Sequence, residues 1–296
     1  MNKILCALAC ASACQAGAAI TVHDDDGAAV TLQKPAQRIM ALAPHVTELL
    51  FAAGGGGRIV GTVNFSDYPE AAKRIPLVGD NREVDIERVI AMKPDLLVVW
   101  RHGAAPRQIE ILRQLGIPMF HSQPKTLDGI ADNLVQLGRL MGTDRVAQAA
   151  AADLRRQLAA LAARYEKRSP VRMFYQVWDK PLYTLNGAHI VSDAIRLCGG
   201  ENVFAALKTT APVLSPEGVL QEDPEAIVGS AEKTVSAGGV NMWRQYPSMT
   251  AVRNDNLFAL NVDLLNRAGP RMIPGAAALC EKLELARQHR KNGAPP

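Results

Sequence analysis

The chain has 296 residues, of which 48% are hydrophobic and 21% are charged, and its formal net charge is +4. This composition is typical of a globular protein and excludes a disordered or fibrous chain. The small, dispersed positive charge argues against a nucleic-acid-binding protein. The length allows two domains of ordinary size.

Residues 1–19 begin the chain with a single positive charge at Lys3, a short apolar run and then small residues. The run is too short to span a bilayer, so the pattern predicts a secretory signal peptide that is cleaved near Ala19. A lipoprotein signal, with Cys14 as the first mature residue, is the alternative. Removal of residues 1–19 takes away Lys3 and lowers the net charge from +4 to +3.

Cleavage would leave two of the five cysteines, Cys198 and Cys280. An even pair in an exported protein predicts one disulfide, because the compartment is oxidising. Two buried free thiols are the alternative.

The first half of the chain alternates between strand-like and helix-like segments. Residues 20–35 are expected to be a mobile arm, because His23–Gly27 is polar and has no periodicity. The segments expected after them are a strand over 38–43, a loop at 44–45, a helix over 46–53, and strands over 59–63, 96–100 and 118–121. Such alternation predicts a parallel sheet covered by helices.

Residues 143–168 are expected to form one long helix. No glycine or proline occurs from 143 to 167. The apolar residues are spaced as on one helical face, at Val146, Ala150, Leu154, Leu158, Leu161 and Tyr165. A helix of this length, about 37 Å, is long enough to connect two lobes.

Two segments 130 residues apart repeat one another, namely 85–99 and 215–229. Each begins with a residue suited to cap a helix, has a glutamate two positions later (Glu87, Glu217), and continues through a proline into an apolar run. The repeat predicts two similarly built α/β lobes with a ligand cleft between them. The expected division is a first lobe over 36–142, the bridging helix over 143–168 and a second lobe over 169–291.

Motifs of catalysis are absent from the sequence. It has no Gly-x-Ser-x-Gly and no His-Glu-x-x-His, and its six histidines are separated. We therefore predict a binding protein rather than an enzyme. An exported enzyme on an α/β scaffold is the alternative.

Several segments carry a resemblance to a known family. They are Pro44–Leu49, Phe65–Pro69, Val78–Trp100, Leu197–Phe204 and Asp263–Arg271. Together they resemble periplasmic substrate-binding proteins that feed ABC importers of cobalamin, haem and iron-siderophores, and most of all the cobalamin-binding members. The resemblance covers residues 36–290.

The resemblance implies a fold of two α/β lobes bridged by one long helix, a periplasmic location and a monomer. It implies a corrinoid ligand such as cobalamin, with haem or a ferric siderophore as the alternative, and no catalytic cofactor. The implied partner is an ABC importer, made of a permease dimer with its ATPase subunits.

The family's ligand contacts carry over to five positions. They are Phe65, Trp100, Tyr183, Asp263 and Arg267. Asn81 stands where the family has an aromatic residue, and His45 replaces a small one. Because His45 follows the first strand, at the carboxyl edge where open α/β sheets bind ligands, we expect it at the mouth of the cleft, facing the metal centre of the ligand. From the residues alone, Trp100 also suits a core position, and the i,i+4 spacing of Asp263 and Arg267 also suits a surface ion pair.

In the family, glutamates matching Glu87 and Glu217 pair with arginines of the permease, one on each lobe. The alternative is that both glutamates only stabilise the first turn of a helix through its dipole.

Overall fold

The computed structural model describes residues 18–80, 83–100, 106–230, 238–261 and 263–292. Residues 1–17 of the predicted signal peptide and the predicted site residue Asn81 lie outside the described residues. The strands are β1 (Ile20–His23), β2 (Ala29–Leu32), β3 (Ile39–Ala41), β4 (Ile59–Thr62), β5 (Leu96–Val99), β6 (Met119–His121), β7 (Val171–Gln176), β8 (Trp178–Asp179), β9 (Leu182–Tyr183), β10 (Gly200–Asn202), β11 (Ala226–Ser230) and β12 (Leu257–Leu260).

The helices follow the same chain order. They are α1 (Pro44–Ala52), α2 (Ile86–Ala91), α3 (Pro106–Gln114), α4 (Leu127–Met141), α5 (Asp144–Tyr165), α6 (Ile190–Leu197), α7 (Pro216–Glu222), α8 (Thr250–Arg253), α9 (Asp263–Asn266) and α10 (Met272–Asn292), with 3-10 helices η1 (Gly56–Arg58), η2 (Glu70–Arg74) and η3 (Gly239–Gln245). None of the helices within the described residues is long and apolar enough to cross a membrane.

Two four-stranded sheets form the centres of two lobes. Their strand orders are β4-β3-β5-β6 and β10-β7-β11-β12, and all neighbouring strands are parallel. The repeated segments supply β5 and β11, which take the third place in the two sheets. The repeat therefore reflects two lobes with one topology, as the sequence predicts.

Each sheet is buried on both faces. In β5, Leu96 and Val98 belong to one core cluster, while Leu97 and Val99 belong to another. The second lobe repeats this arrangement, with Tyr175 on one face of β7 and Phe174 on the other. Burial on both faces explains why these strands are continuously apolar. The predicted fold of two doubly wound α/β lobes is confirmed.

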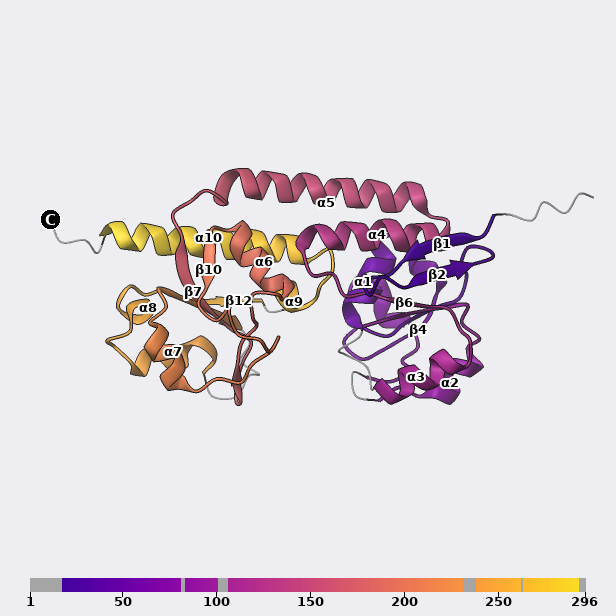
Figure 1. The fold of residues 1–296 in the computed structure, drawn as a ribbon, viewed down its shortest axis with the longest axis horizontal. Helices are drawn as coiled ribbons and strands as arrows, with labels where there is room; N and C mark the ends of the chain where they lie inside the picture. Colours follow the sequence, from indigo (N-terminus) through magenta and orange to yellow (C-terminus); the bar gives the residue numbers. More distant parts are fainter. Residues whose placement is uncertain (1–17, 81–82, 101–105, 231–237, 262, 293–296) are drawn as a thin grey trace, which may run out of the picture.

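The long helix expected over 143–168 is α5, which crosses above both lobes over α4 and α10 (Figure 1). One buried cluster runs beneath it from α1 and α4 to α6 and α10, so the lobes share a core. Such shared packing favours a stiff hinge.

The buried face of α5 differs from the expected one at its start. Ala147 is buried and Val146 is 49% exposed. Helix α4 approaches α5 so closely that a Cβ at Gly138 would lie 2.2 Å from the Cβ of Ala147. A small residue therefore faces α4 where the sequence pattern favoured a larger one.

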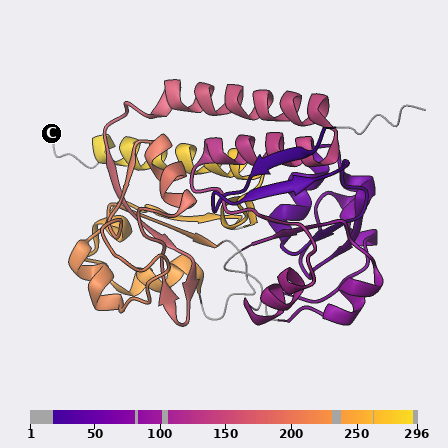
Figure 2. The ribbon, with the colours of Figure 1, turned by 45° about the vertical axis from the view of Figure 1, so that its right-hand side comes forward.

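The N-terminal segment is ordered, so the prediction of a mobile arm over 20–35 is wrong. β1 and β2 pair as an antiparallel hairpin that lies along α4 (Figures 1 and 2). The carboxylate of Asp25 accepts hydrogen bonds from the Asn133 amide at 2.8 and 2.9 Å and from the backbone N–H of Gln123. These hydrogen bonds replace those that water would make with the Asp25 carboxylate. Burial raises the pKa of Asp25, although the Asn133 hydrogen bonds partly oppose this.

Cys198, at the end of α6, forms a disulfide with Cys280 of α10, with an S–S distance of 2.06 Å. The predicted disulfide is confirmed. It ties two helices of the second lobe together across 82 residues of sequence.

Candidate functional site

The predicted site residues lie where parallel strands end. In the first lobe, α1 follows β3, the segment Asn64–Pro69 follows β4, and Trp100 follows β5. In the second lobe, the β8–β9 hairpin follows β7, and α9 follows β12. Because ligands of open α/β sheets bind at the carboxyl ends of the strands, these segments are the natural walls of a site.

Ion pairs join these two carboxyl edges across the lobe junction. The guanidinium of Arg271 donates two hydrogen bonds to the carboxylate of Glu48 in α1, at 2.6 and 2.9 Å. Arg267 donates to Asp67 of the first lobe at 2.7 Å, and also lies 3.5 Å from Glu48 and 3.2 Å from Asp263. We call these five residues the interlobe network.

The centre of the interlobe network is shielded from water, whereas its aspartates, Asp67 and Asp263, are 48% and 39% exposed. The side chain of Glu48 is 2% exposed, that of Arg267 12% and that of Arg271 19%. Removing one partner from a buried pair leaves an uncompensated charge, which typically costs about 3–5 kcal/mol. Loss of Glu48 or of one of its arginine partners would therefore destabilise the junction between the lobes. Asp263 and Arg267 do form the i,i+4 pair, but within the junction rather than on an open surface.

The pKa values within the network follow from these contacts. Partial burial opposes ionisation of Asp67, but the hydrogen bond and charge of Arg267 outweigh it, so the pKa of Asp67 is lowered. Its hydrogen bonds to Glu48 raise the pKa of Arg271. Both shifts favour the charged forms, so the ion pairs persist at neutral pH.

The segment Asn64–Pro69, which we call the aromatic loop, carries two exposed rings beside the network. Phe65 is 71% exposed and Tyr68 is 47% exposed. The guanidinium carbon of Arg271 lies 4.3 Å from the centre of the Tyr68 ring, a cation–π contact. Phe65 has a φ of +66°, which is rare for a bulky residue and costs about 1–3 kcal/mol.

His45 does not lie in a loop at the mouth of the cleft, and that prediction is wrong. It is the second residue of α1 and is 5% exposed. Its Nε2 lies 3.3 Å from the carbonyl oxygen of Ser122. Burial lowers the pKa of His45 to about 4, although the Ser122 contact partly opposes this. The imidazole is therefore neutral at pH 7, with Nε2 turned to the backbone rather than to a ligand.

Trp100 makes the core contacts that the sequence also allowed for it. It is partly buried and packs against the main core cluster. Its ring meets the His45 ring edge to face, with centroids 5.8 Å apart and an interplanar angle of 87°. The buried histidine therefore packs against the indole at the carboxyl end of β5.

Tyr183 lies in the second lobe on β9, paired with Trp178 of β8. It is partly buried, and this burial raises its pKa. Trp178 is 39% exposed, and its indole N–H donates to the Lys180 carbonyl at 3.0 Å. The hairpin thus presents two aromatic rings at the carboxyl end of β7.

Glu87 and Glu217 occupy equivalent places in the two lobes. Both are exposed in the first turn of short helices, α2 and α7, on the side of the molecule away from α5 (Figure 1). Asp85 caps α2 by accepting the Arg88 N–H at 2.9 Å, and Ser215 caps α7 by accepting the Gly218 N–H at 3.2 Å. The repeated sequence has therefore produced two matching, outward-facing carboxylates.

A pocket of about 520 Å³ borders the interlobe network. Its lining includes Glu48 and Tyr68 of the first lobe, Gln157 of α5, and Arg271 of the second lobe. Side chains therefore do not fill the whole junction between the lobes.

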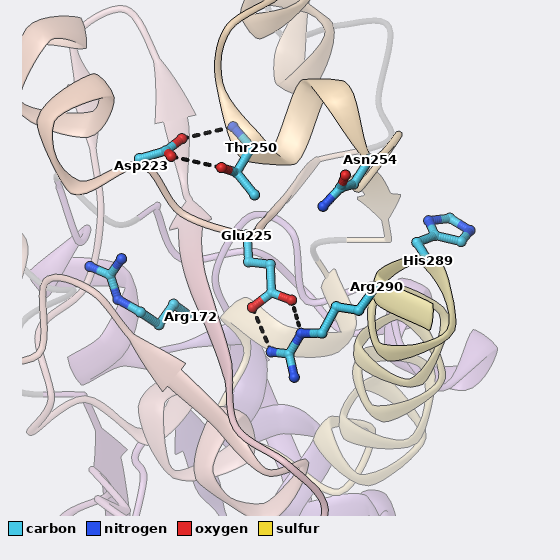
Figure 3. Close-up of a pocket in the computed structure, with 7 residues that line it drawn as sticks. All are labelled: Arg172, Asp223, Glu225, Thr250, Asn254, His289 and Arg290. Atoms are coloured by element: carbon cyan, nitrogen blue, oxygen red, sulfur yellow. Dashed lines mark hydrogen bonds and ion pairs between the residues drawn. The ribbon is translucent and has the colours of Figure 1, made fainter. Parts of the chain in front are cut away.

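A second pocket, of about 550 Å³, lies within the second lobe alone (Figure 3). Its charged groups satisfy one another, because Glu225 pairs with Arg290 and Asp223 accepts hydrogen bonds from Thr250. Arg172 and Glu225 lie at the amino ends of β7 and β11. This pocket is therefore at the sheet edge opposite to the interlobe network.

Sequence reasoning missed Glu48, Asp67 and Arg271, although all three stand in segments that carry the family resemblance. A usable signal was present for Glu48, because a lone carboxylate in the largely apolar α1 indicates a buried, paired charge. Among the described residues, no group of three or more histidine, cysteine, aspartate or glutamate side chains is arranged to hold a metal ion.

Residues 39–264 match the family described as periplasmic binding protein. The chain belongs to this family. The match takes in both sheets and the bridging helix, so this periplasmic binding protein contains the two-lobed unit of its family.

Relatives of this periplasmic binding protein are named for their ligand. It is 40% identical to the vitamin B12-binding protein of Vibrio cholerae over 255 residues, which are 86% of this chain and 91% of the relative. It is 36% identical to the vitamin B12-binding protein of Yersinia pestis over 248 residues, 84% of this chain and 86% of the relative. Because these relatives are binding proteins, the prediction of a binding protein rather than an enzyme is confirmed.

Solved structures agree with the fold. The crystal structure of the periplasmic vitamin B12 binding protein BtuF of Vibrio cholerae superposes with a TM-score of 0.80 at 40% identity, covering 86% of this chain and 98% of that one. The periplasmic heme-binding protein RhuT from Roseiflexus, in apo form, superposes with a TM-score of 0.72 at 25% identity, covering 84% and 99%. The fold is therefore shared by proteins of different ligand class.

Proposed function

We propose that this protein captures a corrinoid such as cobalamin between its lobes and delivers it to an ABC importer. The observation that carries this proposal is the 40% identity to a vitamin B12-binding protein across both lobes, against 25% to the Roseiflexus haem-binding protein. The predicted haem or siderophore ligand is the alternative. The buried Nε2 of His45 gives no support to a metal-coordinating role.

The chemistry of the junction suits a corrinoid. A corrin ring is broad and flat, with an apolar rim from which amide groups project. The rings of Phe65, Trp100 and Tyr183 would supply apolar contact area, while Asp263 and Arg267 would hydrogen-bond the amides. Because these residues come from both lobes, the ligand would bridge the cleft.

Delivery would use the two matching carboxylates. Glu87 and Glu217 are exposed on different lobes, so a two-fold symmetric permease dimer could offer one arginine to each. Arginine–carboxylate pairs fix register and orientation more than they add affinity. The permease and ATPase subunits would be other chains. Export by the N-terminal signal peptide would place the protein in the periplasm. It would act there as a monomer.

Calorimetry on the purified, ligand-free protein tests the proposal. Titration with cyanocobalamin should show one site per monomer, while haemin and a ferric siderophore should bind weakly or not at all. Tight binding of haemin without binding of cyanocobalamin would move the assignment to the alternative.

A pair of variants tests the location of the site. Phe65→Ala should weaken cobalamin binding by about tenfold, because an exposed aromatic contact is lost. Leu115→Ala is the matched control, since Leu115 is 51% exposed at the end of α3 and belongs to no proposed contact. Equal affinities of both variants and the wild type would exclude Phe65 from the ligand contacts.

A further inference from the structure

The aromatic loop, Asn64–Pro69, is anchored to both lobes. On the side of its own lobe, the backbone N–H of Asn64 donates to the Gly79 carbonyl at 2.9 Å, and that of Ser66 donates to the Val63 carbonyl at 3.2 Å. These bonds fix the start of the loop. Its later residues, Asp67 and Tyr68, face arginines of the second lobe.

The conformation of the aromatic loop is locally unfavourable. Phe65 has a φ of +66°, and its ring is 71% exposed. The hydroxyl of Ser66 is buried and has no hydrogen-bond partner among the described residues. A strained backbone and an unsatisfied hydroxyl persist only where the surroundings over-determine the conformation.

Contacts with the second lobe add to the bonds that hold the loop within its own lobe. Arg267 holds the Asp67 carboxylate at 2.7 Å, and Arg271 lies over the Tyr68 ring at 4.3 Å. Arg271 is itself fixed by two hydrogen bonds to the buried carboxylate of Glu48. All of these contacts cross the junction, so separating the lobes would break them together.

We propose that Asp67, Arg267 and Arg271 are positioning residues through which the second lobe holds the aromatic loop in its ligand-facing arrangement. The aromatic loop keeps this conformation only while the lobes are together, because its contacts with Arg267 and Arg271 cross the junction. Any partner that pushed the lobes apart would break these contacts, so the loop would relax and release its hold on the ligand. The identity of the ligand in this proposal rests on the proposed function.

Hydrogen exchange on the ligand-free protein tests the positioning without any ligand. Asp67→Asn removes the charge that Arg267 holds and should speed amide exchange in the peptide spanning 64–75 by about tenfold. Glu222→Gln is the control: it removes a carboxylate that is 39% exposed, against 48% for Asp67, and that pairs with Arg172 in the second lobe, so it should leave this peptide unchanged. Exchange in Asp67→Asn that equals the wild type would overturn the proposal.

Stopped-flow dissociation of cyanocobalamin tests the consequence for the ligand. Asp67→Asn should release it about tenfold faster, and Asp67→Glu, which keeps the charge, should restore slow release. In a Phe65→Ala background, Asp67→Asn should add little, because the phenyl ring that the aromatic loop presents to the ligand is already gone. Fully additive effects would show that Asp67 acts independently of the loop. If the wild type binds no cyanocobalamin, the proposed function fails, while the exchange experiment still decides the positioning role.

Discussion

Acid should destabilise this protein through His45, and the size of the effect follows from its burial. The pKa of His45 is lowered from 6.5 to about 4, chiefly because burial disfavours the charged ring. Below pH 6.5 the unfolded chain takes up a proton at this residue, whereas the folded chain does so only near pH 4. The folded state therefore keeps its full stability with respect to His45 above pH 6.5. As the pH falls towards 4, protonation of His45 in the unfolded chain progressively lowers the free energy of unfolding.

The pKa difference of 6.5 − 4 = 2.5 corresponds to about 3.4 kcal/mol when fully expressed. Between pH 7.5 and pH 5, the linkage relation gives a loss of about 2 kcal/mol. His45→Gln keeps a hydrogen-bond donor at a similar reach but does not titrate, so it should lack this part of the pH dependence.

Urea denaturation of the wild type and of His45→Gln, each at pH 7.5 and pH 5, measures this difference. The free energy of unfolding of the wild type should fall about 2 kcal/mol further than that of the variant. Identical pH dependence in the two proteins, or a His45 pKa near 6.5 by NMR titration, would refute the argument from burial.

Three further predictions address the disulfide, the interlobe network and transport. Replacing Cys198 and Cys280 with serine should lower the free energy of unfolding by up to about 4.5 kcal/mol, the chain-entropy value for a loop of 82 residues; a change below about 1 kcal/mol in urea denaturation would contradict it. Glu48→Gln should lower the free energy of unfolding by about 3 kcal/mol, because loss of a carboxylate that is 2% exposed leaves the charge of Arg271 uncompensated; an unchanged thermal midpoint would argue against a buried ion pair. Glu87→Lys and Glu217→Lys should keep the ligand affinity of the wild type but impair uptake in a reconstituted importer, with undiminished uptake leaving both as ordinary helix-start residues.

The sequence alone determined the architecture. Periodicity and the absence of glycine and proline predicted α5, and the repeat around Glu87 and Glu217 predicted two lobes of one topology. These features are local or repetitive, so they follow from helix and strand periodicity without knowledge of distant contacts. The disulfide was equally accessible, because only two cysteines remained to form it.

The tertiary structure alone decided how the site is assembled. The pairs Glu48–Arg271 and Asp67–Arg267 join residues 223 and 200 positions apart, and no sequence pattern ranks such partners. His45 followed a strand end, as a ligand-facing residue would, yet packing of α1 turned it inward. Whether a polar side chain meets water, a ligand or a buried partner depends on which surfaces the fold brings together, and that is fixed only when the two lobes meet.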